Sequence, residues 1–198
     1  SLDASRAKAV KGVRAVVRIP SGVAVVGDAF WPAKIGREAL TIQWNEGPNR
    51  SLSSAAITRA LRDAATRPGA VARREGDPAG ALAAAALRLE ATYEVPFRAH
   101  ATMEPQTCTV HVRPDGCDVW VPTQHQEATR DVVATITGLP PSAVRVHTTF
   151  LGGGFGRRSE VDFVEEATHV ARAIGAPVQV VWTRADDSRH DLSRPASL

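Results

Sequence analysis

The segment from residue 144 to residue 182 constrains the fold of this chain more than any other part of its sequence. A β-branched run is followed by the glycine-rich stretch LGGGFGRR, then by apolar residues at helical spacing, and then by the apolar run PVQVVW. The predicted order is strand 144–149, loop 151–158, helix 160–174 and strand 177–182. Gly175 after the helix and Pro177 at the start of the second strand support these boundaries. This order predicts a βαβ-like unit.

The remaining sequence adds short strands and helices. Strands are expected at 10–19, 22–26, 41–44, 87–95, 107–112 and 117–121, and helices at 28–36, 53–66, 79–86 and 125–137. We expect the first helix to be capped by Asp28, interrupted near Pro32 and ended by Gly36, and the last to be capped by Thr123. Pro114-Asp-Gly predicts a hairpin turn. Because a hairpin accompanies the βαβ-like unit, the predicted class is α+β with mixed sheets.

Charge and composition argue against several classes of function. The net charge is +3 from 24 Lys and Arg against 21 Asp and Glu, and the basic residues are scattered, so nucleic-acid binding is not expected. No apolar run approaches the roughly 18 residues of a membrane span, and the given sequence shows no positively charged leader with an apolar h-region and a cleavage site. Cys108 and Cys117 fall on one hairpin out of register, which predicts two free, buried thiols in a reducing context. A start at Ser1 without Met suggests a piece of a longer protein.

The glycine-rich loop has several possible explanations. A Walker A loop needs Lys-Ser/Thr at a fixed spacing, and a dinucleotide fingerprint from Gly152 or Gly154 needs glycine where Arg157 or Ser159 stands, so both fail. A tight turn between packed elements remains open, although turn types ask for only one or two residues with positive φ. Four glycines around Phe155 instead favour close approach of the main chain to a ligand that carries phosphate or oxo groups.

Four ordered motifs carry a resemblance to a known family. They are HATMEP (100–105), DGCDVWVPTQ (115–124), LGGGFGRR (151–158) and VVWTRADDSRHDLSRPA (180–196). The chain resembles the molybdenum-binding large subunit of the xanthine dehydrogenase/aldehyde oxidase family. The GFGRR variant is most similar to the isoquinoline 1-oxidoreductase β-subunit type of bacterial aldehyde dehydrogenase. The resemblance covers nearly the whole chain and is weakest over 50–86.

The resemblance implies a domain organisation and a set of cofactors. Residues 1–49 would form the C-terminal part of a hammerhead-like domain, 50–86 a connecting helical segment, and 87–198 an incomplete first molybdopterin-binding subdomain. The cofactor would be a molybdopterin that carries molybdenum, in its cytosine dinucleotide form, with [2Fe-2S] clusters on a partner small subunit and an FAD or cytochrome subunit as a further candidate partner. The implied reaction oxidises an aldehyde or an N-heteroaromatic compound with water as the oxygen source. A cytoplasmic location is expected, or a periplasmic one if a partner subunit is exported.

The resemblance also assigns roles to individual residues. The pterin holds the metal, so no protein side chain is expected to ligate molybdenum. Gln124 would orient an oxygen on the metal, Phe155 would line the substrate pocket, and the loop amides would bind oxygens of the cofactor. The implied cofactor-binding set is Gln124, Gly153, Gly154, Phe155, Gly156, Arg157 and Arg158. The two arginines are expected on a phosphate or at the pocket entrance, and Glu104 and His125 would border the substrate pocket together with Phe155.

Two departures from the family pattern bear on activity. Xanthine-type enzymes carry a pocket Glu where this chain has Ser159, which argues against purine recognition. The family's catalytic Glu lies in a late Gly-x-Gly-Glu motif that this sequence does not contain. The chain by itself is therefore expected to be inactive, and the alternative function is a non-catalytic binding or scaffold module that keeps the fold.

Each candidate residue has a structural alternative. Gln124 would bond backbone locally, and Phe155 would pack in the core. His100 and Glu104 lie in a loop, so a zinc pair is not expected, and ordinary loop hydrogen bonding is the alternative to a place at the substrate funnel. Asp186 and Asp187, near His190 and Asp191, suggest a carboxylate pair, but a solvated polar turn is the expected reading. Ser159 lacks a G-x-S-x-G elbow, so a hydrolase triad is excluded.

Overall fold

The computed structural model describes residues 1–73 and 75–193, which form two compact units. Unit 1 comprises Ser1–Asn45 and Ala99–Leu192, and unit 2 comprises Glu46–Arg98 together with Ser193 onwards. The chain therefore leaves unit 1 after residue 45 and returns to it at residue 99. The expected division at 49 and 86 remains a prediction, because these units follow packing and not family domains.

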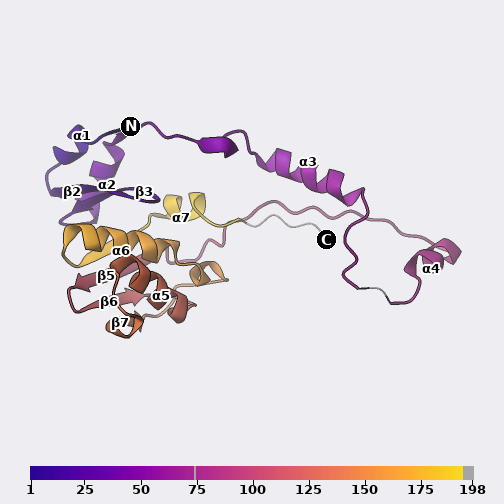
Figure 1. The fold of residues 1–198 in the computed structure, drawn as a ribbon. Coiled ribbons are helices and arrows are strands. Elements are labelled where there is room, and N and C mark those ends of the chain that lie inside the picture. Colours follow the sequence, from indigo (N-terminus) through magenta and orange to yellow (C-terminus); the bar gives the residue numbers. More distant parts are fainter. Residues whose placement is uncertain (74, 194–198) are drawn as a thin grey trace. The chain divides into compact units, whose positions relative to one another are not determined.

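A four-stranded mixed sheet forms the centre of unit 1 (Figure 1). Its strands are β5 (Thr107–Arg113), β6 (Gly116–Val121), β7 (Val144–Thr148) and β8 (Val178–Val181), in the order β7-β6-β5-β8. The β5–β6 hairpin is antiparallel, β8 pairs antiparallel with β5, and β7 pairs parallel with β6. These directions make β7 and β8 parallel to each other at opposite edges of the sheet. The predicted βαβ-like unit and the mixed α+β class are confirmed.

Two helices cover the apolar face of the sheet. They are α5 (Gln126–Thr137) and α6 (Asp162–Ile174), which end at the left-handed glycines Gly138 and Gly175 as the sequence predicts. Alternate strand residues such as Val110, Val119 and Val121 point into a core that these helices close, and all three are fully buried. The short helices η2 (Pro141–Ala143), η3 (Arg157–Ser159) and α7 (Arg184–Arg189) complete this part of unit 1.

The N-terminal segment packs on the other side of α6. It contains β1 (Leu2–Asp3), α1 (Ser5–Lys8), β2 (Val13–Ile19), β3 (Gly22–Gly27), α2 (Phe30–Glu38) and β4 (Thr41–Ile42). The antiparallel hairpin β2–β3 lies against α6, which separates it from the sheet (Figure 1). Ile19, Ala24 and Val26 extend the hydrophobic core. The hydroxyl of Ser21 donates to Glu166 Oε1 at 3.4 Å, and Arg37 pairs with Asp186 at 2.7 Å.

Helix α2 differs from its prediction in three respects. Its N-cap is Ala29 and not Asp28, whose carboxylate instead pairs with Arg14. Pro32 does not interrupt the helix, because it occupies the first turn, where a missing N–H costs nothing. Gly36 lies inside the helix and does not end it: a Cβ there would lie 2.7 Å from Val13 Cγ2. This glycine permits close packing of the helix on the hairpin.

Unit 2 contains η1 (Gly47–Asn49), α3 (Ser54–Ala65) and α4 (Pro78–Ala84). Ser53 caps α3 by accepting a hydrogen bond from the Ala56 amide. The strand expected at 87–95 is wrong, since these residues are irregular and exposed. Their alternating pattern has no strand to pair with in the described part of unit 2, and a single extended segment cannot form a ladder.

Candidate cofactor site at the carboxyl edge of the sheet

One edge of the sheet gathers the segments that carry the sequence motifs. Because β6, β7 and β8 run parallel and β5 runs against them, the C-terminal ends of three strands meet the N-terminal end of β5. The loops at this edge are 102–106, 122–125, 149–158 and 182–187. Backbone hydrogen bonds join them: Gln124 N to Arg158 O at 3.0 Å and Glu104 N to Gly152 O at 3.0 Å. Ligand sites of sheets with parallel strands form at such carboxyl edges.

The glycines of the loop serve two different physical purposes. A Cβ on Gly152 would lie 2.3 Å from Glu104 Cβ, and one on Gly154 would lie 2.6 Å from Gln124 Oε1, so these two positions permit close approach of neighbouring segments. Gly153 and Gly156 have φ of +102° and +95°, which side chains rarely adopt. The close approach seen at these two glycines is toward protein neighbours, which agrees with the alternative of a turn between packed elements. Approach to a ligand remains a proposal.

Phe155 is held in an unusual position. Its φ is +54°, and its side chain is 75% exposed, so the alternative that it packs in the core is wrong. In the described residues, Ala101 is the only other non-glycine residue with positive φ (+48°), and it lies in the neighbouring loop. Backbone conformations of this kind cost energy and gather at functional sites. An exposed aromatic ring on a strained backbone therefore marks this edge of the sheet as a candidate site.

The backbone amides of the loop divide into two groups. The amide of Gly152 donates to Glu104 Oε2 at 2.9 Å, and that of Gly156 donates to Gln124 Oε1 at 3.1 Å. The three amides between them, those of Gly153, Gly154 and Phe155, have no acceptor within residues 1–73 and 75–193. The amide of Gly156 was expected to face the cofactor, but in this structure it is hydrogen-bonded to Gln124.

Gln124 is fixed by two of its neighbours. Its Oε1 accepts the amides of Gly156 at 3.1 Å and Arg158 at 3.3 Å. These bonds determine which end of the side-chain amide faces the loop, because only oxygen can accept. The Nε2 group has no acceptor in the part of the chain that the structure describes, and a Cβ added to Gly154 would lie 3.1 Å from it. The side chain therefore presents a fixed pair of N–H donors at the edge of the loop.

Arg157 and Arg158 do not lie where a phosphate could reach them. Both are buried, with exposures of 1% and 0%. Arg157 binds Asp162 through two hydrogen bonds of 2.9 and 2.7 Å, and these, with the charges of Asp162 and Asp191, outweigh burial and raise its pKa. Burial lowers the pKa of Arg158, against the attraction of Glu104. The expected contact of these two side chains with phosphate finds no support in this structure.

Glu104 and His125 occupy the border of the same edge. The Glu104 carboxylate accepts the Gly152 amide and pairs with Arg158 Nη2 at 3.0 Å, so it ties the 102–106 loop to the glycine loop. His125 is exposed at the N-cap of α5, and its amide donates to Thr123 Oγ1 at 3.0 Å. Thr123 therefore does not cap the helix directly, as the sequence led us to expect. Both border residues remain candidates for the substrate pocket.

The prediction of a solvated polar turn is wrong for Asp187 in α7 and for Asp191 just after it. Asp187 is 2% exposed and accepts a hydrogen bond from Gln106 Nε2 at 3.1 Å. Asp191 is also buried and binds both the backbone and the ring of His100, with 2.8 Å to Nδ1. These contacts use His100 in loop hydrogen bonding, as its structural alternative predicted. Arg184 further anchors Asp187 and the carbonyls of the 102–103 segment.

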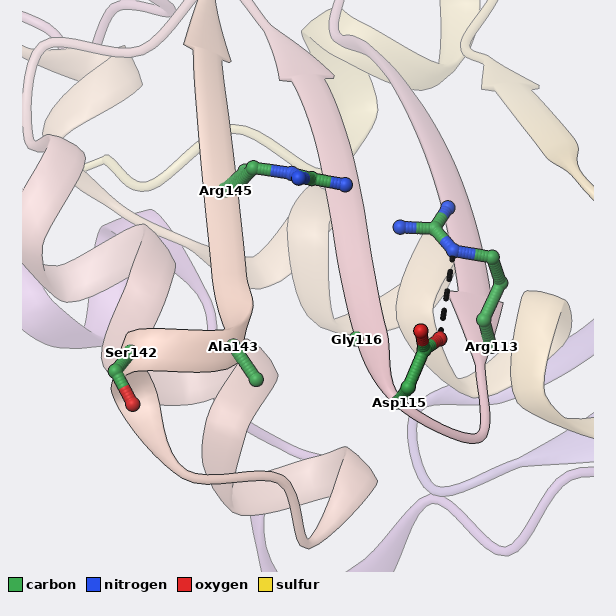
Figure 2. A pocket seen from close by; sticks show the side chains of 6 residues that line it. All are labelled: Arg113, Asp115, Gly116, Ser142, Ala143 and Arg145. Atoms are coloured by element: carbon green, nitrogen blue, oxygen red, sulfur yellow. Dashed lines mark ion pairs between the residues drawn. The ribbon is translucent and has the colours of Figure 1, made fainter.

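A shallow hollow of about 350 Å³ lies at the opposite edge of the sheet, between the β5–β6 turn and the start of β7 (Figure 2). Arg113 and Arg145 reach toward it, but both bind Asp118, and Arg145 does so at 2.9 and 3.1 Å. Hydrogen bonds from Arg145 and then from His147 hold the pKa of Asp118 well below its usual range. The charges that line the hollow are thus matched within the protein, and the feature does not form part of the candidate site.

Comparison with known proteins identifies the family. The model of the molybdopterin cofactor-binding domain matches residues 63–198. The chain belongs to the molybdopterin cofactor-binding domain family. The β-subunit of isoquinoline 1-oxidoreductase from Brevundimonas diminuta is 31% identical over 205 aligned residues, which cover 98% of this chain and 26% of that protein. The recognition made from the four motifs is confirmed.

Solved structures share the fold of this chain. The aldehyde oxidoreductase of Desulfovibrio gigas superposes with a TM-score of 0.74 at 17% identity, over 98% of this chain and 26% of that one. Quinoline 2-oxidoreductase from Pseudomonas putida 86 gives 0.68 at 21% identity, over 94% and 29%. The chain thus spans about a quarter of the length of these relatives.

The residues at the carboxyl edge fit a molybdopterin in the chemistry of their donors. Three adjacent backbone amides that find no acceptor within the described ranges, together with the Nε2 group of Gln124, offer N–H donors. Such donors suit the anionic oxygens of this cofactor. Within the described residues, no three His, Cys, Asp or Glu side chains come together as a metal site. No helix in those residues is long and apolar enough to cross a membrane.

The structure also reveals contacts that the sequence pattern did not show. The bond between Glu104 and Gly152 joins residues 48 positions apart, and the inward direction of Arg158 depends on three separate loops. A paired arginine directly behind a glycine loop, in a chain with few lysines, was the available signal. It indicated a cation at the site but not the direction in which its side chain points.

Proposed function

We propose that this chain is the part of a molybdenum hydroxylase large subunit that holds one side of the molybdopterin. The complete enzyme would oxidise an aldehyde or an N-heteroaromatic compound with water as the oxygen source and pass electrons to a [2Fe-2S] subunit. The proposal is supported by family membership and by relatives named for isoquinoline, quinoline and aldehyde oxidation. The cofactor would be the cytosine dinucleotide form of molybdopterin.

The observation that carries the proposal is the row of three amides at Gly153, Gly154 and Phe155 that have no acceptor among the described residues. Gly153 and Gly154 are half-buried and Phe155 is exposed, so these amides form a row of N–H donors that a bound ligand can reach. The acceptor must be rich in oxygen to satisfy several donors at once. The phosphate or oxo groups of a molybdopterin have this property.

Each residue of the edge would contribute by position. The three amides would bind anionic oxygens, and Gln124 would direct its Nε2 hydrogens at an oxygen near the metal, since its Oε1 is already occupied. Phe155 would shield the reacting centre from water and contact the substrate ring or chain. When bound, the cofactor supplies the two-electron redox chemistry, which no side chain of this edge provides.

Two features of the sequence limit what the chain does alone. It contains no Gly-x-Gly-Glu motif to supply the general base of the family, and Ser159 replaces the pocket Glu of the xanthine-type enzymes. We therefore expect no turnover from the isolated chain, and aldehydes or N-heteroaromatics in preference to purines from the complete protein. The pocket border formed by Glu104 and His125 would contribute to this preference.

The test is to purify the full-length protein that contains this chain and to measure molybdenum, pterin and released cytidine monophosphate per polypeptide. Oxidation of benzaldehyde, isoquinoline and hypoxanthine in ¹⁸O-labelled water then reports both the substrate class and the oxygen source. We expect near-stoichiometric molybdenum and label in the aldehyde or heteroaromatic product. A full-length protein without molybdenum or pterin would refute the proposal and favour the non-catalytic module.

A further inference from the structure

The carbonyl groups of the glycine loop explain why three of its amides, those of Gly153, Gly154 and Phe155, find no acceptor in the described part of the chain. The carbonyl of Gly152 accepts the Glu104 amide at 3.0 Å, that of Gly153 accepts Arg158 Nε at 2.8 Å, and that of Gly154 accepts the Arg157 amide at 2.9 Å. Three successive carbonyls are thus bonded to protein. In a planar trans peptide unit, the C=O of one residue and the N–H of the next point in opposite directions. Binding these three carbonyls inward therefore turns the next three amides outward.

Of the three hydrogen bonds to these carbonyls, the one to Gly153 comes from a side chain, that of Arg158. Its guanidinium is fully buried, and its donors reach three loops: Gly153 O at 2.8 Å, Glu104 O at 2.7 Å and Pro122 O at 3.4 Å, besides the Glu104 carboxylate at 3.0 Å. A buried cation is costly unless hydrogen bonds replace its water. Here backbone carbonyls provide most of the hydrogen bonds that replace water around the guanidinium. The position of the guanidinium therefore depends on the conformation of the main chain.

We propose that Arg158 is a positioning residue that aims the Gly154 amide at an anionic oxygen of the cofactor. This inference rests on the proposed function. The guanidinium is suited to this task because its planar fork serves several carbonyls at fixed angles. A lysine would keep the charge, but its donors lie on a single nitrogen and cannot reproduce bonds that Arg158 makes from Nε, Nη1 and Nη2. The peptide between Gly153 and Gly154 would then be free to rotate.

The oxygen that accepts this hydrogen bond could belong to either of two groups with the same chemistry, an oxo group on the metal or a phosphate of the pterin. An altered contact to the metal would change the Mo(V) spectrum of the protein that retains cofactor. An altered contact to a phosphate would lower the cofactor content and leave the spectrum of the remainder unchanged. Either result supports the positioning role, and the two distinguish the sources.

The experiment compares R158K with wild type and two controls in the full-length holoenzyme. R172K also removes an arginine bond to a backbone carbonyl, that of Ile136 at 2.6 Å, away from the site. Gly36→Ala lowers stability through packing remote from the loop. Molybdenum and pterin content, the Mo(V) electron paramagnetic resonance spectrum and the melting temperature are measured for each protein.

We expect R158K to retain about a tenth or less of the wild-type molybdenum and pterin content, or to show a shifted Mo(V) spectrum. Both controls should retain cofactor and spectrum at an equal or lower melting temperature. Full cofactor content with an unchanged spectrum in R158K would overturn the inference, as would an equal loss in Gly36→Ala at matched stability. If the wild-type protein itself holds no molybdopterin, the proposed function fails first.

Discussion

The contact between Gly154 and Gln124 gives a prediction whose magnitude follows from the structure. In Gly154→Ala, the new Cβ would lie 2.6 Å from Gln124 Oε1 and 2.7 Å from its Cδ, whereas non-bonded carbons rest about 3.5–4.0 Å apart. The end of Gln124 is flexible and can rotate away. It then gives up the hydrogen bonds from the Gly156 and Arg158 amides, at about 0.5–1.5 kcal/mol each. We therefore expect a loss of about 2 kcal/mol in the free energy of unfolding.

A double-mutant cycle tests the mechanism of this loss. Gln124→Ala removes the same two hydrogen bonds and also the atoms that the new Cβ would strike, so each single variant should lose about 2 kcal/mol. The double variant should lose no more than Gln124→Ala alone, which gives a coupling energy of about 2 kcal/mol. Gly69→Ala, where the structure places no atom within 4 Å of the new Cβ, is the neutral control.

Urea denaturation of the four proteins, followed by tryptophan fluorescence, measures the cycle. Simple additivity of the two single variants would refute the reasoning, because it would mean that the new methyl group at position 154 does not touch Gln124. The larger replacement Gly154→Val should additionally abolish molybdenum retention in the full-length protein, since it adds two methyl groups to a Cβ that already lies 2.6 Å from Gln124 Oε1. Normal metal content in that variant would show that the bare main chain of the loop is not needed to hold the cofactor.

Three further predictions concern other parts of unit 1. Gly36→Ala should lower the free energy of unfolding by about 1–3 kcal/mol in urea, because its Cβ would lie 2.7 Å from Val13 Cγ2; an unchanged midpoint would contradict the packing described. Asp118→Asn should lower the melting temperature at pH 7 and flatten its fall in acid. The hydrogen bond from Arg145 lowers the pKa of the Asp118 carboxyl in the folded protein. The charged carboxylate therefore stabilises the fold above the unfolded pKa of about 3.9, and this stabilisation is lost as the pH falls through the lower folded pKa. Parallel acid profiles of the variant and the wild type would argue against this explanation. Burial raises the pKa of Cys117 to about 11, so a thiol reagent at pH 8 should react slowly until urea unfolds the chain, and rapid labelling of the native protein would show the burial to be wrong.

Local patterns in the sequence predicted most of the fold. Helical periodicity with a glycine at C′ located the helices that end at Gly138 and Gly175, and Pro114-Asp115 located the hairpin turn. These patterns involve only a few neighbouring residues, so they can be recognised without knowledge of tertiary contacts. The expected strand at 87–95 failed because alternation alone does not supply a pairing partner.

The candidate site was predictable in its location but not in its contacts. The glycine run and Gln124 were found from motifs, and the structure places them together at the carboxyl edge of the sheet. The direction of Arg158 could not be predicted, because its acceptors are backbone carbonyls of loops that are distant in sequence. The role of Gly36 was predicted wrongly for a similar reason. The sequence alone does not distinguish a glycine that ends a helix from one that permits close packing of that helix.

The interruption of unit 1 between residues 45 and 99 bears on how the protein emerges from the ribosome. Hairpin β2–β3 packs on the nearby helix α2 and also on α6, which begins only at Asp162. At about 5–20 residues per second, roughly 7 to 27 s of synthesis separate the end of the hairpin from the start of α6. Over that interval the apolar side chains of the hairpin that meet α6 stay uncovered, which makes the nascent N-terminal segment a natural client for a chaperone that binds chains during translation.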